Sequence, residues 1–210
     1  MPQEALKKFT EDNYKGLRNW APIFRALKAA GIKTVSPEEA YAATSTGRAP
    51  GPLDLVLGAP PVLLDVREET VHARARPLGA VNTPLYRFMG KPESAFDYLR
   101  IFVFATAFAL RPPVRNDTFA AEVTALVGGN KRTPVYVICS SGGTLETAAE
   151  RKIRAPRIPA PIFGQFGAAS RSLLAAHELL QAGFTNIIHV EGGYSAWVSR
   201  KLPGDGDAVK

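Results

Sequence analysis

The feature that most constrains the fold is a series of short apolar runs that alternate with a helical pattern. The runs are PVLLDVRE (residues 61–68), TPVYVIC (133–139) and NIIHV (186–190). Continuous apolar runs of this length are typical of strands buried on both faces of a parallel sheet. Between the last two, SRSLLAAHELLQAGF predicts a helix with Ser170 as N-cap and Gly183 as its stop. Strands alternating with helices predict an α/β fold built on a parallel sheet.

The N-terminal part of the sequence predicts two further helices. Leu17, Trp20, Phe24 and Leu27 recur at helical spacing before Gly31. Ser36 then precedes Pro37, which predicts an N-cap and a helix over 37–43. With 210 residues, the chain is long enough for one sizeable core. We expect a helical extension over 1–34, one domain over 35–203 and a short tail over 204–210.

Composition narrows the classes of partner and compartment. The single cysteine excludes an internal disulfide framework, so a reducing compartment fits best. The net charge of +7 favours anionic partners. Because the basic residues form no long tract and no aromatic stripe accompanies them, we expect no nucleic-acid partner. The three histidines are scattered, and we read His177 and His189 as packing residues and predict no metal site.

The most apolar stretch of the chain lies between the first two predicted strands. Residues 101–110 carry no charge, but they are half the number needed to cross a bilayer. The sequence therefore predicts no transmembrane span. A buried helix and a peripheral membrane contact through aromatic side chains both remain open for this stretch.

Cys139 ends the second predicted strand and is followed by the residues SSGGT. Ligands of open parallel sheets lie beyond the carboxyl ends of the strands. Glycines allow the backbone to turn with its N–H groups facing one point, and hydroxyl side chains add donors, so such a loop favours an anion. A thiolate or persulfide of Cys139 fits that description. The alternative is that Cys139 is a small core hydrophobe.

Five sequence blocks together resemble the rhodanese-like domain family of sulfurtransferases, and in particular the plastid rhodanese-like proteins of plants and green algae. The blocks are VLLDVRE (62–68), LGAVNTP (78–84), PVYVICSSGG (134–143), SRSLLAAHELLQAGFTNIIHVEGGYSAW (170–197) and Leu202-Pro203. The resemblance implies a five-stranded parallel sheet flanked by helices. It also implies a chloroplast location, in the stroma or associated with the thylakoid.

The resemblance implies a reaction in which Cys139 takes a sulfane sulfur from a small anionic donor and passes it to a thiol or to cyanide. No cofactor is implied. The backbone amides of Ser140, Ser141, Gly142, Gly143 and Thr144 would cradle the persulfide, as donors in an oxyanion hole do. Arg171 would steer the anionic donor, and Arg67 would either face the pocket or pair with Asp65.

The chain departs from the family pattern in one way that concerns the site. An arginine and a serine often follow the cysteine after four residues, but position 144 is threonine, and the arginine–serine pair is Arg171-Ser172. The loop is therefore lengthened, and the insertion over 144–170 is predicted to form a lid, to bind the donor or to contact a protein partner.

Two alternative functions remain open from the sequence. One is a catalytically weak rhodanese fold that serves as a binding or structural subunit of a thylakoid-associated complex. Its contacts would be the insertion over 144–170 and the apolar segment 96–110. The other is a phosphatase-like oxyanion pocket, which is disfavoured because the arginine that such a pocket requires is absent at Thr144.

Overall fold

The computed structural model describes residues 20–45, 59–88, 94–95, 97–99, 113–147, 149–150 and 166–206. Its centre is a five-stranded sheet in the order β1-β8-β7-β2-β4, and every neighbouring pair is parallel. The strands are β1 (Lys33–Val35), β2 (Val62–Asp65), β4 (Val81–Asn82), β7 (Val135–Ile138) and β8 (Ile187–Val190). The predicted α/β fold and parallel sheet are confirmed, and β1 lies partly within the predicted extension.

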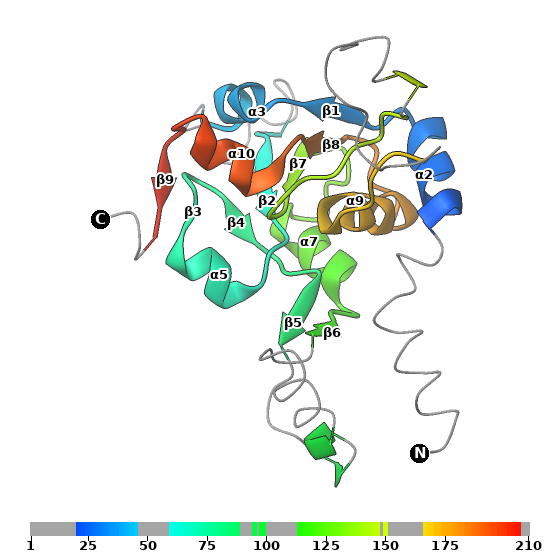
Figure 1. Cartoon of the computed structure of the whole chain (residues 1–210), viewed down its shortest axis with the longest axis vertical. Coiled ribbons are helices and arrows are strands. Elements are labelled where there is room, and N and C mark those ends of the chain that lie inside the picture. Colours follow the sequence, from blue (N-terminus) through cyan, green and yellow to red (C-terminus); the bar gives the residue numbers. More distant parts are fainter. Residues whose placement is uncertain are drawn as a thin grey trace.

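Helices cover both faces of this sheet (Figure 1). On one face, α2 (Trp20–Ala29), α7 (Phe119–Leu126) and α9 (Arg171–Gln181) pack on the larger hydrophobic cluster. On the other face, α3 (Pro37–Thr44) and α10 (Gly193–Ser199) pack on a smaller cluster around Trp197. The molecule therefore has the three layers expected of a buried parallel sheet.

The alternation of side chains along β7 decides where Cys139 points. Val135, Val137 and Cys139 belong to the cluster beneath α9, whereas Ile138 belongs to the cluster beneath α3 and α10. Successive side chains of a strand point to opposite faces, so Cys139 continues the α9 side of β7 although it lies just past the last strand residue. Its sulfur is thereby placed near the N-terminus of α9.

Smaller elements surround the sheet. The helix α5 (Glu69–Arg74) follows β2, and two antiparallel ribbons pair β3 (Arg76–Pro77) with β9 (Gly204–Asp205) and β5 (Tyr86–Phe88) with β6 (Pro113–Arg115). In Figure 1 the β5–β6 ribbon lies at the lower margin of the domain.

The predicted helix starts are confirmed by their capping contacts. Ser36 and Glu39 form a reciprocal capping box at the start of α3. The Ser170 side chain accepts a hydrogen bond from the Leu173 N–H at the start of α9. Several predictions concern segments that lie outside the described residues, namely 1–19, 101–110, 151–165 and 207–210. None of the helices that the structure describes is long and apolar enough to cross a bilayer.

Candidate active site

The loop after β7 bends so that one backbone N–H faces the cysteine sulfur. Gly142 donates its N–H to Cys139 Sγ at 3.4 Å. Gly142 and Gly143 both have φ near +76°, which is the left-handed region that favours glycine. A Cβ on Gly142 would lie 2.4 Å from the backbone nitrogen of Gly192, so no side chain fits there. Both glycines are thus required by the path of the loop.

The amides of the loop do not all converge on the sulfur, contrary to the prediction. The Gly143 N–H donates to the Ser141 carbonyl, and the Thr144 N–H donates to the Ala168 carbonyl. Thr144 and Ala168 exchange both hydrogen bonds in an isolated antiparallel bridge. This bridge closes the base of the insertion and takes the Thr144 amide away from the cradle, although Thr144 still lines the cavity.

Ser172, which the sequence analysis did not single out, supplies a second polar contact to the sulfur. Its Oγ lies 3.2 Å from Cys139 Sγ, 3.2 Å from the Gly142 carbonyl oxygen and 3.0 Å from Ser170 Oγ. The Ser172 hydroxyl has one proton. With a Cys139 thiol, Ser172 donates to the Gly142 carbonyl and accepts from the thiol; with a Cys139 thiolate, Ser172 donates to the sulfur, and His189 alone bonds that carbonyl. The signal for this role was the position of Ser172 two residues after the predicted N-cap, at the start of the helix that faces the loop.

His189 fixes the Gly142 carbonyl from within the sheet. Its Nε2 lies 2.8 Å from that oxygen, and the side chain is fully buried. Burial lowers the pKa of His189 to about 4, so the ring is neutral near pH 7. Because a carbonyl oxygen only accepts, Nε2 carries the ring proton. The predicted packing role of His189 is therefore incomplete: the ring also orients the residue whose N–H faces the sulfur.

The N-terminus of α10 holds the other side of the loop. Tyr194 and Ser195 donate their N–H groups to the carbonyl oxygens of Cys139 and Ser140. A Cβ on Gly193 would lie 2.3 Å from the Cys139 carbonyl oxygen, so only glycine allows this approach. The motif EGGYSAW thus serves to dock α10 against the cysteine loop.

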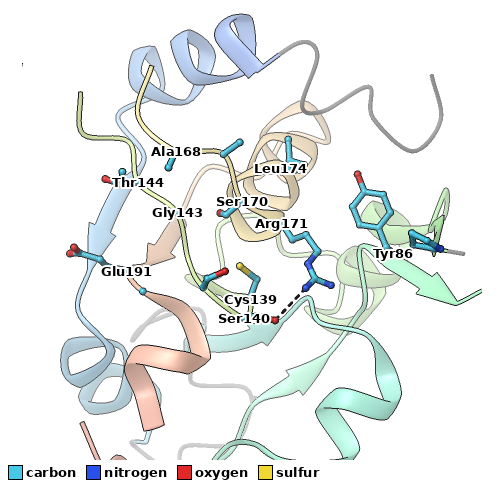
Figure 2. A pocket seen from close by; sticks show the side chains of 14 residues that line it. Tyr86, Cys139, Ser140, Gly143, Thr144, Ala168, Ser170, Arg171, Leu174 and Glu191 are labelled. Atoms are coloured by element: carbon cyan, nitrogen blue, oxygen red, sulfur yellow. Dashed lines mark hydrogen bonds between the residues drawn. The ribbon is translucent and has the colours of Figure 1, made fainter. Parts of the chain in front are cut away.

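A cavity of about 660 Å³ opens at Cys139 (Figure 2). Its wall includes Ser140, Ser141, Gly143 and Thr144 of the loop, together with Tyr86, Leu174, Arg171 and Glu191. Arg171 Nη2 donates to Ser140 Oγ at 3.3 Å, which confirms that its guanidinium lies beside the cysteine loop. The cavity therefore presents both a cation and a carboxylate to a ligand, along with apolar surface from Tyr86 and Leu174.

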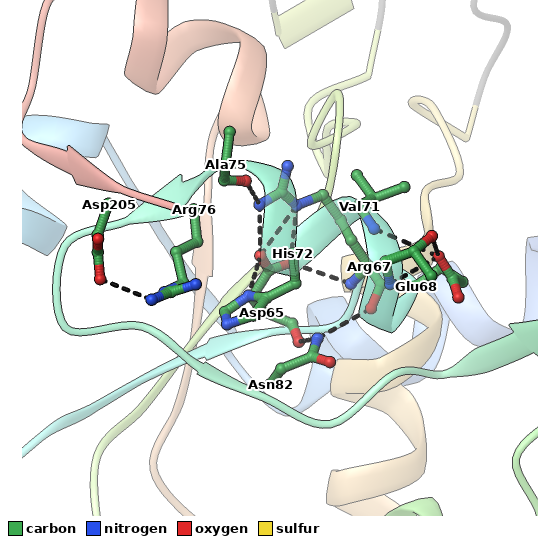
Figure 3. A network of polar contacts seen from close by, with 10 residues as sticks. Asp65, Arg67, Glu68, Val71, His72, Ala75, Arg76, Asn82 and Asp205 are labelled. Carbon is green, nitrogen blue, oxygen red and sulfur yellow. Dashed lines mark hydrogen bonds and ion pairs between the residues drawn. The ribbon is translucent and has the colours of Figure 1, made fainter. Parts of the chain in front are cut away.

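Arg67, the remaining predicted binding residue, lies away from this cavity in a buried network (Figure 3). Its Nη2 is 2.6 Å from Asp65 Oδ2 and 2.8 Å from the Ala75 carbonyl oxygen, and its side chain is 3% exposed. The guanidinium carbon also lies 4.0 Å from the centre of the Tyr194 ring. Arg67 therefore ties β2 to α5 and α10, which is the structural alternative that the sequence left open.

The same network keeps Asp65 ionised. Burial raises its pKa, but hydrogen bonds from His72 and Arg67 outweigh burial, and the pKa lies below its ordinary value. His72 Nδ1 is 2.9 Å from Asp65 Oδ2, so the carboxylate is bonded from two sides. Asp65 and Arg67 thus stabilise the carboxyl end of β2 next to the cysteine loop.

Both described ends of the insertion contact α2. The Trp20 indole N–H donates to the Phe166 carbonyl at 2.6 Å, and the Phe24 and Phe166 rings meet edge to face. At the other end, Lys28 pairs with Glu150 at 2.9 Å. Residues 151–165 of the insertion, which was predicted to form a lid, to bind the donor or to contact a partner, lie outside the described residues. The N-terminal helix therefore holds the start and the return of the insertion beside α9.

Hydrogen-bond donors and one cationic side chain surround the cysteine sulfur. One backbone N–H and one hydroxyl reach Cys139 Sγ, and a cationic side chain lies beside the same loop. Such donors stabilise charge that develops on a reacting atom. Among the described residues, no group of three histidine, cysteine or carboxylate side chains is close enough to bind a metal ion.

The sequence of this chain is similar to that of known proteins. Residues 53–200 match the model of the rhodanese-like domain. Over 142 residues the chain is 32% identical to rhodanese-like domain-containing protein 14, chloroplastic, of Arabidopsis thaliana. The matched region covers 68% of this chain and 56% of that protein. The chain thus spans little more than half the length of this relative.

Two of the solved structures that match this chain have low sequence identity to it. A thiosulfate sulfurtransferase from Pseudomonas aeruginosa has 16% identity and a TM-score of 0.44, over 89% of this chain and 22% of that chain. A rhodanese-like domain protein from Staphylococcus aureus has 17% identity and a TM-score of 0.38, over 79% and 91% of the two chains. On the match to residues 53–200, this chain belongs to the rhodanese-like domain family.

Proposed function

We propose that this chain is a sulfurtransferase that carries a sulfane sulfur as a persulfide on Cys139. The observation that carries the proposal is the position of Cys139 Sγ at a cavity of about 660 Å³, within reach of the Gly142 N–H and the Ser172 hydroxyl. A buried cysteine that served only packing would need neither the cavity nor these donors.

The reaction has two displacements on sulfur. In the first, the Cys139 thiolate attacks the outer sulfur of thiosulfate, an S–S bond forms, and the electron pair of the broken S–S bond leaves with sulfite. In the second, cyanide or a thiolate attacks the outer sulfur of the persulfide, and the electron pair of the S–S bond returns to Cys139. Charge and sulfur balance in both steps, and no metal or redox cofactor takes part.

The residues around Cys139 have separate roles in this mechanism. The Gly142 N–H and the Ser172 hydroxyl stabilise the thiolate, and the same donors are available to the persulfide. Arg171 attracts the anionic donor to the mouth of the cavity. His189 and α10 position the loop and touch no substrate.

The test of the proposal is the formation of thiocyanate from thiosulfate and cyanide. We expect turnover by the wild type and none by Cys139→Ser, which retains a small polar side chain at the same place. A folded wild-type protein that forms no thiocyanate with thiosulfate or with an organic persulfide donor would contradict the proposal.

We also infer a chloroplast location, because the Arabidopsis relative is chloroplastic.

A second function, docking to a protein partner, is favoured by an exposed apolar surface. Phe88 and Val114 lie on the β5–β6 ribbon. Tyr98 and Leu99 belong to the segment of chain between β5 and β6. All four side chains are apolar or aromatic, and these residues are 36–64% exposed. In this role the chain would be a subunit of a thylakoid-associated complex. Phe88→Asp with Val114→Lys should then abolish co-elution with a plastid complex, whereas flotation with lipid vesicles would indicate peripheral membrane contact instead.

A further inference from the structure

Two side chains from different elements bond the carbonyl oxygen of Gly142. His189 Nε2 on β8 lies 2.8 Å from this oxygen, and Ser172 Oγ on α9 lies 3.2 Å from it. Gly142 is buried. A buried carbonyl oxygen without a donor is costly, but one donor is enough to satisfy it. One of the two donors can therefore be withdrawn without leaving the oxygen unpaired.

Ser172 can use its single proton in two directions. Its Oγ lies 3.2 Å from Cys139 Sγ and 3.2 Å from the Gly142 carbonyl oxygen. Ser170 Oγ lies 3.0 Å from the same hydroxyl and already accepts the Leu173 N–H, so Ser170 can donate its own proton to Ser172. When the Cys139 thiol loses its proton to water, the Ser172 hydroxyl turns from the carbonyl to the sulfur. Deprotonation of Cys139 thus takes one donor away from Gly142.

The His189 ring is held so that its donor stays on the carbonyl. The side chain is fully buried, and burial lowers its pKa to about 4, so near neutral pH the ring carries a single proton. Thr34 on the neighbouring strand β1 pairs with His189 in register, and its Oγ1 lies 3.4 Å from Nδ1. Because Nε2 holds the proton, Nδ1 accepts from the Thr34 hydroxyl. The contact with Thr34 therefore favours the tautomer whose proton faces Gly142.

We infer that His189 is a positioning residue for the sulfur chemistry: it keeps the Gly142 carbonyl bonded and so allows Ser172 to donate its proton to the Cys139 thiolate. The inference rests on the proposed function, because the thiolate is the form that attacks the sulfur donor. Without His189, the turn of Ser172 toward the sulfur would leave this buried oxygen with no side-chain donor from the described part of the chain. The thiolate would then form less readily.

The titratable groups that face the sulfur are separate from this arrangement. Arg171 of α9, Glu191 after β8 and Tyr86 of β5 line the cavity at Cys139. Burial raises the pKa of Tyr86, so its phenol is neutral near pH 7. His189 does not line this cavity. A substitution of His189 that leaves the three lining side chains intact therefore tests the carbonyl contact and not the charge of the cavity.

Two amide side chains of different length separate the reach of the side chain at position 189 from its polarity. His189→Gln brings an amide N–H to the place of Nε2, where it can bond the carbonyl. His189→Asn is one methylene shorter, so its amide reaches only the place of Nδ1. The measurement is the rate of Cys139 alkylation by iodoacetamide between about pH 6 and pH 10, which follows the thiolate. We expect the midpoint of this pH profile to rise by about one unit in His189→Asn, a tenfold loss of thiolate stabilisation, and by less than about 0.3 unit in His189→Gln.

A double-mutant cycle shows whether His189 acts through Ser172. In the wild-type background, His189→Asn should lower kcat/KM for thiosulfate about tenfold, and His189→Gln should lower it less than about twofold. In the Ser172→Ala background the hydroxyl is absent, so His189→Asn should lower kcat/KM by no more than about a further twofold. A role of His189 in folding alone would give the same loss in both backgrounds.

The matched control uses a second histidine, His177, whose contact with Gln181 at 3.3 Å lies on the exposed side of α9. His177→Asn and His177→Gln should leave the alkylation midpoint and kcat/KM unchanged. Urea unfolding of each variant shows whether it is folded. If His189→Asn does not fold, His189→Leu takes its place with the same expected shift, because leucine fills the space but has no donor.

The outcomes separate this inference from the proposed function. A folded wild-type protein that forms no thiocyanate would contradict the proposed function, whereas the alkylation midpoints report on His189 without any turnover. A midpoint that rises in His189→Asn but not in His189→Gln supports the inference. An unchanged midpoint in His189→Asn, or an equal rise in both variants, would overturn it even if sulfur transfer by the wild type were normal.

Discussion

The substitution Ser172→Ala tests the contact between the Ser172 hydroxyl and Cys139 Sγ, which the sequence did not predict. In Ser172→Ala, Cys139 Sγ loses a donor at 3.2 Å, while the Gly142 N–H stays in place. The Gly142 carbonyl loses its contact with Ser172 but keeps His189 Nε2 at 2.8 Å. No buried acceptor is therefore left without a partner at Gly142.

These contacts predict a large effect on rate and a small effect on folding. A hydrogen bond to a charged group contributes about 1.5–3 kcal/mol, which corresponds to roughly a ten- to hundredfold loss in kcat/KM for thiosulfate. Loss of a neutral hydrogen bond whose acceptor remains bonded lowers the free energy of unfolding by about 1 kcal/mol.

The assay measures thiocyanate formation at several thiosulfate concentrations, alongside urea unfolding. Ser199→Ala is the control, because the Ser199 hydroxyl is exposed on α10 and donates to the Ala196 carbonyl. If Ser172→Ala retained kcat/KM within twofold while folding normally, the stabilisation of the thiolate by Ser172 would be refuted.

Two further predictions concern the loop and its support. In the folded protein the pKa of His189 is about 4, against an ordinary value near 6.5. Between pH 6.5 and pH 4 the unfolded chain therefore binds more protons than the folded protein. The free energy of unfolding falls as the pH drops through this range, by at most about 3 kcal/mol. His189→Gln, which can still donate to the Gly142 carbonyl, should flatten that part of the pH profile of urea midpoints; an unchanged slope would contradict the neutral buried ring. Gly142→Ala should lower the free energy of unfolding by at least about 1–2 kcal/mol and abolish thiocyanate formation, because its φ is +76° and its Cβ would meet the Gly192 backbone at 2.4 Å. Gly79→Ala is the comparison, because Gly79 has the same φ of +76° but lies in open space. Normal activity of Gly142→Ala would show that activity does not require this path of the loop.

The strands and helix starts were predictable because their signals are local. The continuous apolar runs at β2, β7 and β8 report burial on both faces, and Ser36 and Ser170 each cap a helix through contacts within three residues. The placement of Cys139 at the carboxyl end of the sheet follows from the parallel topology.

The details of the site depend on contacts between distant segments, which local patterns do not report. The Thr144 amide was expected to face the sulfur, but it pairs with Ala168, which returns from the insertion. Ser172 and His189 reach the loop from 30 and 47 residues away along the chain from Gly142. The motif left open whether Arg67 faces the pocket or pairs with Asp65, and only the positions of Asp65 and Ala75 show that its donors are used in a buried network.

The central claim is that Cys139 accepts a sulfur atom and holds it in the cavity. The most direct measurement is the intact mass of the folded protein after incubation with thiosulfate, followed by peptide mapping. The account predicts the mass of one additional sulfur atom, located on Cys139, absent from Cys139→Ser and removed by cyanide with release of thiocyanate. A folded protein whose mass stays unchanged, or whose added sulfur is not released by cyanide, would contradict it.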